Sequence, residues 1–236
     1  ATSPDDLAAA AASEVIALLD SAIAWRGEAH LALSGGRTPA ALHRVLASTP
    51  FEGWPFVHVW FGDERTVPPD HADSNYLMAR ETLLDLVPIP AAQVHRLAGE
   101  DEPGAAAAAY HEALAALARD QEREAPTFDV LLLGMGADAH TASLFPGSPL
   151  LATDAPDTFA TAVDVPKLST TRLTVTPATI KAARAVLVLV AGADKHDALT
   201  RALGADPPLA DAPVTLLRDV PGDVAWYVDR AALFGV

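Results

Sequence analysis

Four short segments of this sequence combine glycine with polar or charged side chains, and each directly follows an apolar run. They cover residues 34–39, 62–65, 134–143 and 191–195. A short apolar run that stops at glycine is typical of a buried strand, and open α/β sheets bind ligands at the carboxyl ends of their strands. If the four runs are parallel strands, their polar segments lie along one edge of the sheet and form one site.

The segment from Gly134 to Ser143 holds the best candidate for proton transfer. His140 lies in this polar loop, and Asp138 precedes it by two residues. A neutral imidazole can take a proton from water near pH 7, and a carboxylate can orient the ring. The plainer alternative is a loop histidine with a structural hydrogen bond. A single Asp-x-His pair lacks the further ligands of a metal motif, so we predict no metal site.

The segment after the first predicted strand has the chemistry of an anion-binding loop. Its residues are Ser34, Gly35, Gly36, Arg37 and Thr38, followed by Pro39. The glycines allow close approach to the backbone, and the helix that follows offers free N–H groups and the positive end of its dipole. An ordinary strand-to-helix turn capped by Thr38 explains the same residues equally well.

Asp63, Glu64 and Arg65 place two acids and a base just past another apolar run. Without further context, a solvated charged turn is the simpler interpretation of these three residues. Ten residues downstream, Asp73 or Ser74 can cap a helix.

Two cations adjoin further predicted strands. Arg172 opens one strand, and Lys195 follows the strand that ends at Val190. Either can be an ordinary exposed charge. In an acidic chain, however, cations close to an anion-binding loop are candidates for holding the anion.

Composition narrows the classes of partner. The chain has 16 basic and 31 acidic residues and a net charge of −15, which disfavours nucleic acid and anionic lipid as partners. It has no cysteine, so we expect neither disulfides nor thiolate chemistry. No apolar run reaches the roughly 20 residues of a membrane span, and the start of the chain lacks the positive charge of a secretory signal. We therefore expect a cytoplasmic protein; whether it is a homo-oligomer stays open.

Helical and strand patterns alternate along the chain. The expected helices cover 4–25, 38–46, 73–84, 105–123, 177–183 and 194–203. The expected strands cover 30–33, 57–61, 128–133, 172–176, 185–190, 214–217 and 224–228. This alternation, with fully apolar strands, predicts an α/β fold with a mostly parallel sheet covered by helices. We find no clear linker and expect residues 1–236 to form a single domain.

The motifs together resemble those of the 6-phosphogluconolactonases, in the wider family that these enzymes share with glucosamine-6-phosphate deaminases and isomerases. Ser34 to Pro39, Gly62 to Pro68, Asp73 to Tyr76 and Gly134 to Pro146 match the family's motifs in order. Weaker matches lie at 172–174 and 192–195.

The resemblance implies a Rossmann-like fold and hydrolysis of 6-phospho-D-glucono-1,5-lactone to 6-phospho-D-gluconate, a step of the oxidative pentose phosphate pathway. It implies a sugar-phosphate lactone as the partner and neither cofactor nor metal. By position, His140 becomes the general base and Arg65 stabilises the developing oxyanion. Asp63 and Asp138 position these groups. The substrate and its phosphate bind to Ser34, Gly35, Gly36, Arg37, Thr38, Gly134, Arg172 and Lys195.

Two other functions stay open. One is an aldose–ketose isomerase or deaminase on the same fold, and the other is a sugar-phosphate sensor without catalysis. The deaminase branch carries an acidic residue five positions after its motif histidine, where this chain has Phe145. It also places an aromatic residue where this chain has Arg65. Both differences favour the lactonase.

One position departs from the resemblance. Ala139 lies where the family usually has glycine between the aspartate and the histidine. If the backbone there requires a positive φ, an alanine strains or reshapes the loop that carries His140.

Overall fold

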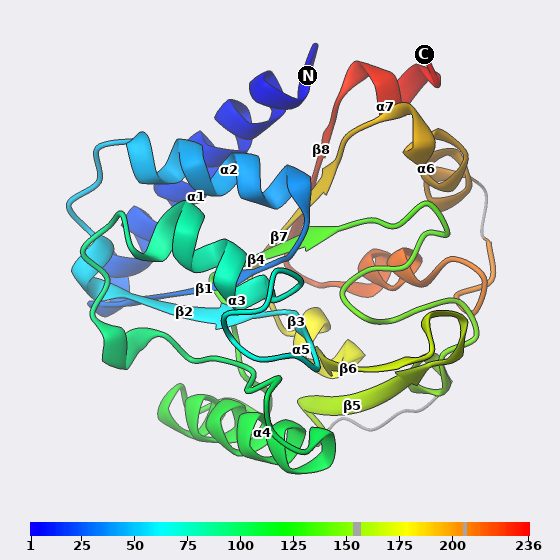
Figure 1. Ribbon diagram of the computed structural model, residues 1–236. Coiled ribbons are helices and arrows are strands. Elements are labelled where there is room, and N and C mark those ends of the chain that lie inside the picture. Colours follow the sequence, from blue (N-terminus) through cyan, green and yellow to red (C-terminus); the bar gives the residue numbers. More distant parts are fainter. Residues whose placement is uncertain (153–156, 205–206) are drawn as a thin grey trace.

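Five strands pair in the order β2-β1-β4-β7-β8 and form a fully parallel main sheet in the computed structural model, which describes residues 1–152, 157–204 and 207–236 (Figure 1). The strands are β1 (Ala29–Leu33), β2 (Val57–Phe61), β4 (Val130–Gly134), β7 (Ala185–Val190) and β8 (Asp223–Val228). β1 and β7 are buried along their whole length, as expected of parallel strands inside an α/β sheet. The predicted mostly parallel α/β architecture is confirmed.

A second, smaller sheet was not predicted. It is antiparallel, in the order β3-β6-β5. Its strands are β3 (Asp63–Arg65), β5 (Ala160–Val165) and β6 (Thr170–Val175). Gly62 joins the two sheets: its N–H donates to the Leu33 carbonyl in β1 at 2.9 Å, and its carbonyl accepts from the Val175 N–H at 2.9 Å. The segment expected to be a charged turn is therefore a strand at the junction of both sheets.

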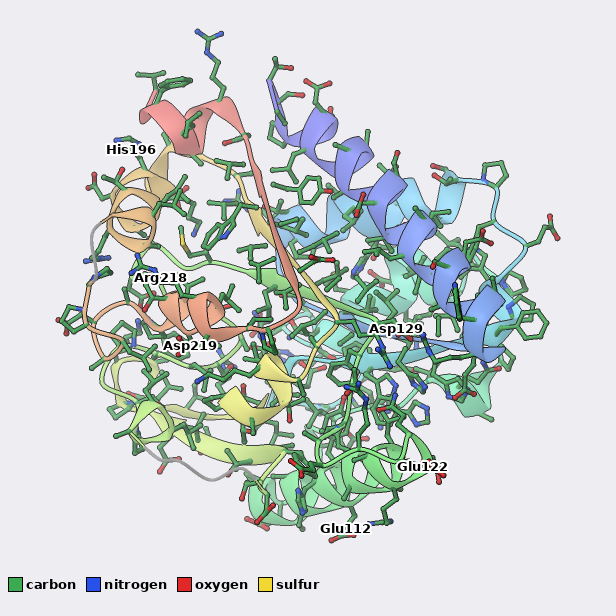
Figure 2. All side chains as sticks on the ribbon, turned by 180° about the vertical axis from the view of Figure 1, so that it is seen from behind. Glu112, Glu122, Asp129, His196, Arg218 and Asp219 are labelled. Atoms are coloured by element: carbon green, nitrogen blue, oxygen red, sulfur yellow. The ribbon has the colours of Figure 1, made fainter. Side chains whose placement is uncertain are left out.

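Helices flank the sheets on both sides (Figure 1). They are α1 (Pro4–Arg26), α2 (Arg37–Ser48), α3 (Asn75–Ala79), α4 (Pro103–Asp120), α5 (Pro177–Lys181), α6 (His196–Leu203) and α7 (Arg230–Phe234). α1 and α2 pack together against the main sheet, whereas α4 packs against β5 and β6 of the small sheet. Figure 2, the view from behind, shows Glu112 on the outer side of α4.

α1 has the ends that its sequence predicts. The Ser3 side chain caps it by accepting from the Asp6 N–H at 3.1 Å, and Gly27 ends it in the left-handed conformation, at φ +82°. By length and composition alone, α1 is apolar enough to cross a membrane, although no uninterrupted apolar run in it reaches the predicted limit of about 20 residues. Alanines raise the average hydropathy although charges interrupt the apolar run. The larger apolar residues Leu7 and Leu19 are fully buried in the core.

Two predicted elements differ from the structure. The predicted strand 214–217 lies in a 3-10 helix, η7 (Pro213–Asp219), because a short buried apolar run has no periodicity that separates strand from helix. Pro213 begins this helix, and the Thr215 hydroxyl donates to the Ala212 carbonyl at 2.8 Å. The predicted helix 73–84 is α3 followed by a π-helical turn, η2 (Arg80–Leu84).

Candidate active site

The loop after β4 turns sharply back on itself and presents His140. The Gly136 N–H donates to the His140 carbonyl at 2.9 Å, and the Thr141 hydroxyl donates to the Gly134 carbonyl at 2.9 Å. Ala139 adopts φ +67° in the middle of this turn and is fully buried. The position does require a positive φ, so the alanine carries strain of about 1–2 kcal/mol that a glycine would avoid.

Asp138 orients the His140 ring. Its Oδ1 lies 2.5 Å from His140 Nδ1 and also accepts from the His140 N–H at 3.2 Å. Nδ1 is therefore the protonated nitrogen of the neutral ring, which leaves Nε2 with the lone pair that a general base needs. Gly136 makes room for this pair, since a Cβ there would lie 2.0 Å from His140 Nδ1.

Burial lowers the pKa of His140 to about 4. Asp63 opposes this shift, whereas Lys195 and Arg172 add to it. All three side chains act electrostatically on one imidazole, although they come from three separate segments of the chain. His140 is consequently neutral near pH 7, which is the state that can accept a proton.

Asp63 connects the His140 loop to the start of α3. Its Oδ2 accepts from the Ser143 hydroxyl at 2.7 Å, and its Oδ1 accepts from Asn75 Nδ2 at 3.2 Å. The two aspartates therefore differ in role: Asp138 contacts His140 directly, and Asp63 holds the surrounding segments and faces the ring at longer range.

Glu64 is a buried anchor that the sequence did not reveal. Its carboxylate accepts from the backbone N–H groups of Arg65, Asn75 and Tyr76 at 2.7, 2.7 and 2.8 Å, and from the Ser74 hydroxyl at 3.1 Å. Burial raises its pKa, and the backbone donors oppose that rise. Glu64 thereby fixes β3 to the N-terminus of α3, where Ser74 is the capping residue.

Arg65 and Arg172 lie opposite each other in the antiparallel pairing of β3 with β6. Burial lowers the pKa of Arg172, and the neighbouring Arg65 lowers it further. Arg65 also donates to the Asp73 carbonyl. Two adjacent guanidinium groups repel each other, so an anion between them is strongly stabilised. This pair suits an oxyanion or a phosphate.

The predicted anion-binding loop precedes α2. Gly36, at φ +105°, is the N-cap residue, and no side chain caps this end of the helix within the described residues. Thr38 is therefore not the cap. The first N–H groups of α2 keep their capacity to bind an anion, since they have no partner within the helix. Arg37 is exposed at the start of α2.

The loop packs directly against the rest of the candidate site. A Cβ on Gly35 would lie 1.9 Å from Asn75 Oδ1, so only glycine fits there. Ser34 borders Gly134 at the ends of adjacent strands: a Cβ on Gly134 would lie 3.8 Å from Ser34 Oγ. These contacts bring the anion-binding loop and the start of the His140 loop together at one edge of the main sheet.

Lys195 ends the short 3-10 helix η6 (Ala193–Lys195) after β7 and pairs with the neighbouring Asp194 at 3.2 Å. Its side chain is only 24% exposed. Its positive charge is one of the causes that lower the pKa of His140.

Lys167 is a further charged residue that the sequence analysis missed. It lies at the turn between β5 and β6 and forms an ion pair with Asp138. No motif singles it out, because the hairpin that carries it was not predicted.

Two other features of the structure do not mark this site. Among the described residues, no group of three or more His, Asp or Glu side chains is arranged to hold a metal ion. A cavity of about 960 Å³ lies elsewhere, bordered by Leu150, Thr158 and Lys181 among others, and none of its lining residues is a predicted site residue. The proton-transfer and anion-binding groups therefore define the candidate site.

Comparison with known proteins identifies the family. The model of the glucosamine-6-phosphate isomerases/6-phosphogluconolactonase family matches residues 2–226, and the chain belongs to this family. The resemblance inferred from the motifs is thereby confirmed.

Within the family, several curated relatives are named 6-phosphogluconolactonase. The chain is 41% identical to the 6-phosphogluconolactonase of Nostoc over 92% of this chain and 89% of that protein. It is 40% identical to the 6-phosphogluconolactonase of Mycobacterium tuberculosis over 97% and 93%. The solved 6-phosphogluconolactonase of Trypanosoma brucei superposes with a TM-score of 0.81 at 30% identity, over 98% of this chain and 95% of that one. These relatives are hydrolases, which agrees with the predicted class of enzyme.

Proposed function

We propose that this chain hydrolyses 6-phospho-D-glucono-1,5-lactone to 6-phospho-D-gluconate, with His140 as the general base. The observation that carries the proposal is the His140–Asp138 pair, whose ring nitrogen Nε2 is left available and whose surroundings hold the cations Arg65, Arg172, Lys167 and Lys195. The names of the relatives support the substrate.

In the proposed reaction, His140 Nε2 takes a proton from a water molecule whose oxygen adds to the lactone carbonyl. Negative charge develops on the carbonyl oxygen, and Arg65 stabilises it. The C–O bond of the ring ester then breaks, and the protonated imidazole returns its proton to the departing oxygen. Water is the only co-reactant, so the step balances without a redox cofactor.

The phosphate of the substrate would bind at the N-terminus of α2. Its oxygens can accept from the free N–H groups of Arg37 and Thr38 and pair with Lys195 and Arg172. Gly35 and Gly36 keep this loop free of side chains that would block the approach. A phosphate held there places the sugar ring toward the His140 loop, because Ser34 and Gly134 are adjacent.

The surroundings of His140 favour the lactonase over the deaminase. The Phe145 ring lies 4.2 Å from the His140 ring, centroid to centroid, so an aromatic contact occupies the position of the deaminase's acidic residue. Phenylalanine cannot exchange a proton during ring opening, whereas water adds directly to a lactone carbonyl. Conversion of glucosamine 6-phosphate, with release of ammonia, is therefore not expected.

The test is turnover of the lactone, corrected for its spontaneous hydrolysis, by the unmodified protein and by His140→Gln. We expect the variant to lose about 10²–10⁴-fold in kcat while it still binds 6-phosphogluconate. A folded variant with unchanged turnover would remove His140 from the mechanism. Binding of the product without turnover by the unmodified protein would instead favour the sensor.

A further inference from the structure

Lys167 reaches from the small sheet to the proton-transfer pair of the main sheet. It lies in η5 (Pro166–Leu168), in the turn between β5 and β6, where register pairs Val165 with Thr170. Its Nζ forms an ion pair with Asp138 Oδ2, whereas the other carboxylate oxygen, Oδ1, holds His140 Nδ1. One carboxylate thus connects the lysine to the histidine.

A second contact fixes the lysine in the same place. Lys167 Nζ lies 4.4 Å from the centre of the Phe145 ring, and that ring packs against His140. A cation over an aromatic face is attracted by the ring's quadrupole. Lys167 therefore contacts two side chains that themselves contact His140: Asp138 through an ion pair and Phe145 over its aromatic face.

We propose that Lys167 is a positioning residue, which holds Asp138 and Phe145 so that His140 keeps its proton on Nδ1 and presents Nε2 to water. This inference rests on the proposed function of His140. Without the lysine, the Asp138 carboxylate keeps its hydrogen bonds to His140 but loses the contact that restrains Oδ2, so that the imidazole is held less firmly in its orientation. Orientation of a base within hydrogen-bond reach is what efficient proton transfer requires.

The pair is placed to serve the reaction rather than the stability of the fold. The side chains of Lys167 and Asp138 are 48% and 31% exposed, and exposed ion pairs contribute little to stability. Removing the lysine therefore leaves the protein folded, so that its effect on His140 can be measured.

The decisive measurement is the pKa and tautomer of the His140 imidazole by NMR in the absence of substrate, in Lys167→Met and Lys167→Arg. Loss of the positive charge leaves Asp138 unneutralised, so we expect the pKa of His140 to rise in Lys167→Met and to return most of the way in Lys167→Arg. The matched control is Lys181→Met, which removes another surface lysine paired with an aspartate, Asp219, at 3.3 Å. We expect this control variant to leave the pKa and the tautomer of His140 unchanged.

Kinetics supply the second readout. We expect Lys167→Met to lower kcat about 10-fold, a part of what a general base contributes, with KM changed less than about twofold. The acidic limb of the pH profile of kcat/KM moves to higher pH, and Lys167→Arg restores most of the rate.

The outcomes separate the two proposals. Lactone turnover in the unmodified protein, together with an unchanged His140 in Lys167→Met, overturns the positioning role and leaves the proposed function intact. A fall in kcat without a change in the pKa or tautomer of His140 also overturns it. No turnover in the unmodified protein, with a raised pKa of His140 in Lys167→Met, rejects the proposed function and retains the positioning role.

Discussion

At the scale of single residues, the candidate site depends on how tightly the His140 loop closes. Ala139 sits in a left-handed conformation inside this loop, and Gly136 lies directly against the imidazole. Strained or crowded backbone persists where surrounding contacts hold it, and such positions concentrate at functional sites. The loop therefore tolerates little added volume beside the ring.

Gly136→Ala tests this directly. The new Cβ would lie 2.0 Å from His140 Nδ1 and 2.6 Å from Asp138 Oδ1, so the two side chains must separate. We expect lactone turnover to fall at least about 10-fold, because the base loses its orienting carboxylate. Steady-state kinetics and the His140 NMR signals measure the effect.

Gly134→Ala, at the last residue of β4 just before this loop, is the matched control. Its added Cβ meets its nearest neighbour, Ser34 Oγ, at an ordinary contact distance of 3.8 Å. We expect the His140 signals to stay as in the unmodified protein. Equal disturbance of those signals by both alanines would mean that the loop is sensitive to any substitution.

At the scale of elements, Glu64 joins β3 to the N-terminus of α3 through four hydrogen bonds to one buried carboxylate. Glu64→Gln turns one acceptor into an NH₂ group that faces backbone donors. We expect the free energy of unfolding to fall by about 1–3 kcal/mol, measured by chemical denaturation. Turnover also falls, because Arg65 follows Glu64 directly in β3 and donates to the Asp73 carbonyl. Loosening the contact between β3 and α3 therefore displaces the Arg65 side chain.

The exposed Glu81, in the π-helical turn after α3, provides the control. Glu81→Gln makes the same chemical change without a buried carboxylate. We expect it to change the free energy of unfolding by less than about 0.5 kcal/mol. A similar loss from both variants would contradict the anchoring role of Glu64.

Sequence patterns located the main sheet and most helices, because apolar runs between glycine turns carry a strong signal. The same patterns could not separate a buried strand from a 3-10 helix at 214–217. They found β6, the middle strand of the small sheet, as the strand at 172–176, but they missed its partners, since β3 is only three charged residues long and β5 alternates without a motif. Sequence patterns therefore also missed Lys167, which lies in the turn between β5 and β6. When two sheets contribute residues to one site, the sequence reveals only those residues that belong to recognisable motifs.

At the scale of the whole molecule, histidines that are neutral in the fold set the acid sensitivity. Burial lowers the pKa of His43 to about 3, of His95 and His140 to about 4, and also lowers the pKa of His30. The unfolded chain binds these protons at about pH 6.5, so it holds more protons than the folded protein between pH 6.5 and 4. Stability therefore falls as the pH drops through this range.

Denaturant unfolding at pH 7.5 and pH 5 measures this loss. We expect a lower free energy of unfolding at pH 5, and fully buried His43 alone contributes on the order of 1–2 kcal/mol of the difference. His43→Leu reduces the difference by that amount. Equal free energies of unfolding at the two pH values would contradict the assignment of neutral buried histidines.

Gly62 lies where the two sheets meet, and this junction has a thermodynamic consequence. Its two backbone hydrogen bonds connect the sheets, while the candidate site takes His140 from one sheet and Arg65 and Arg172 from the other. A ligand that contacts residues of both sheets acts as a non-covalent cross-link. At a ligand concentration of 100 times its Kd, it raises the free energy needed to separate the sheets by about 2.7 kcal/mol. The coupling is reciprocal, so the contact between the sheets also affects how tightly the ligand binds. A change that loosens the β5–β6 hairpin far enough to part the sheets in some of the molecules weakens ligand binding, because those molecules lack the bridged site.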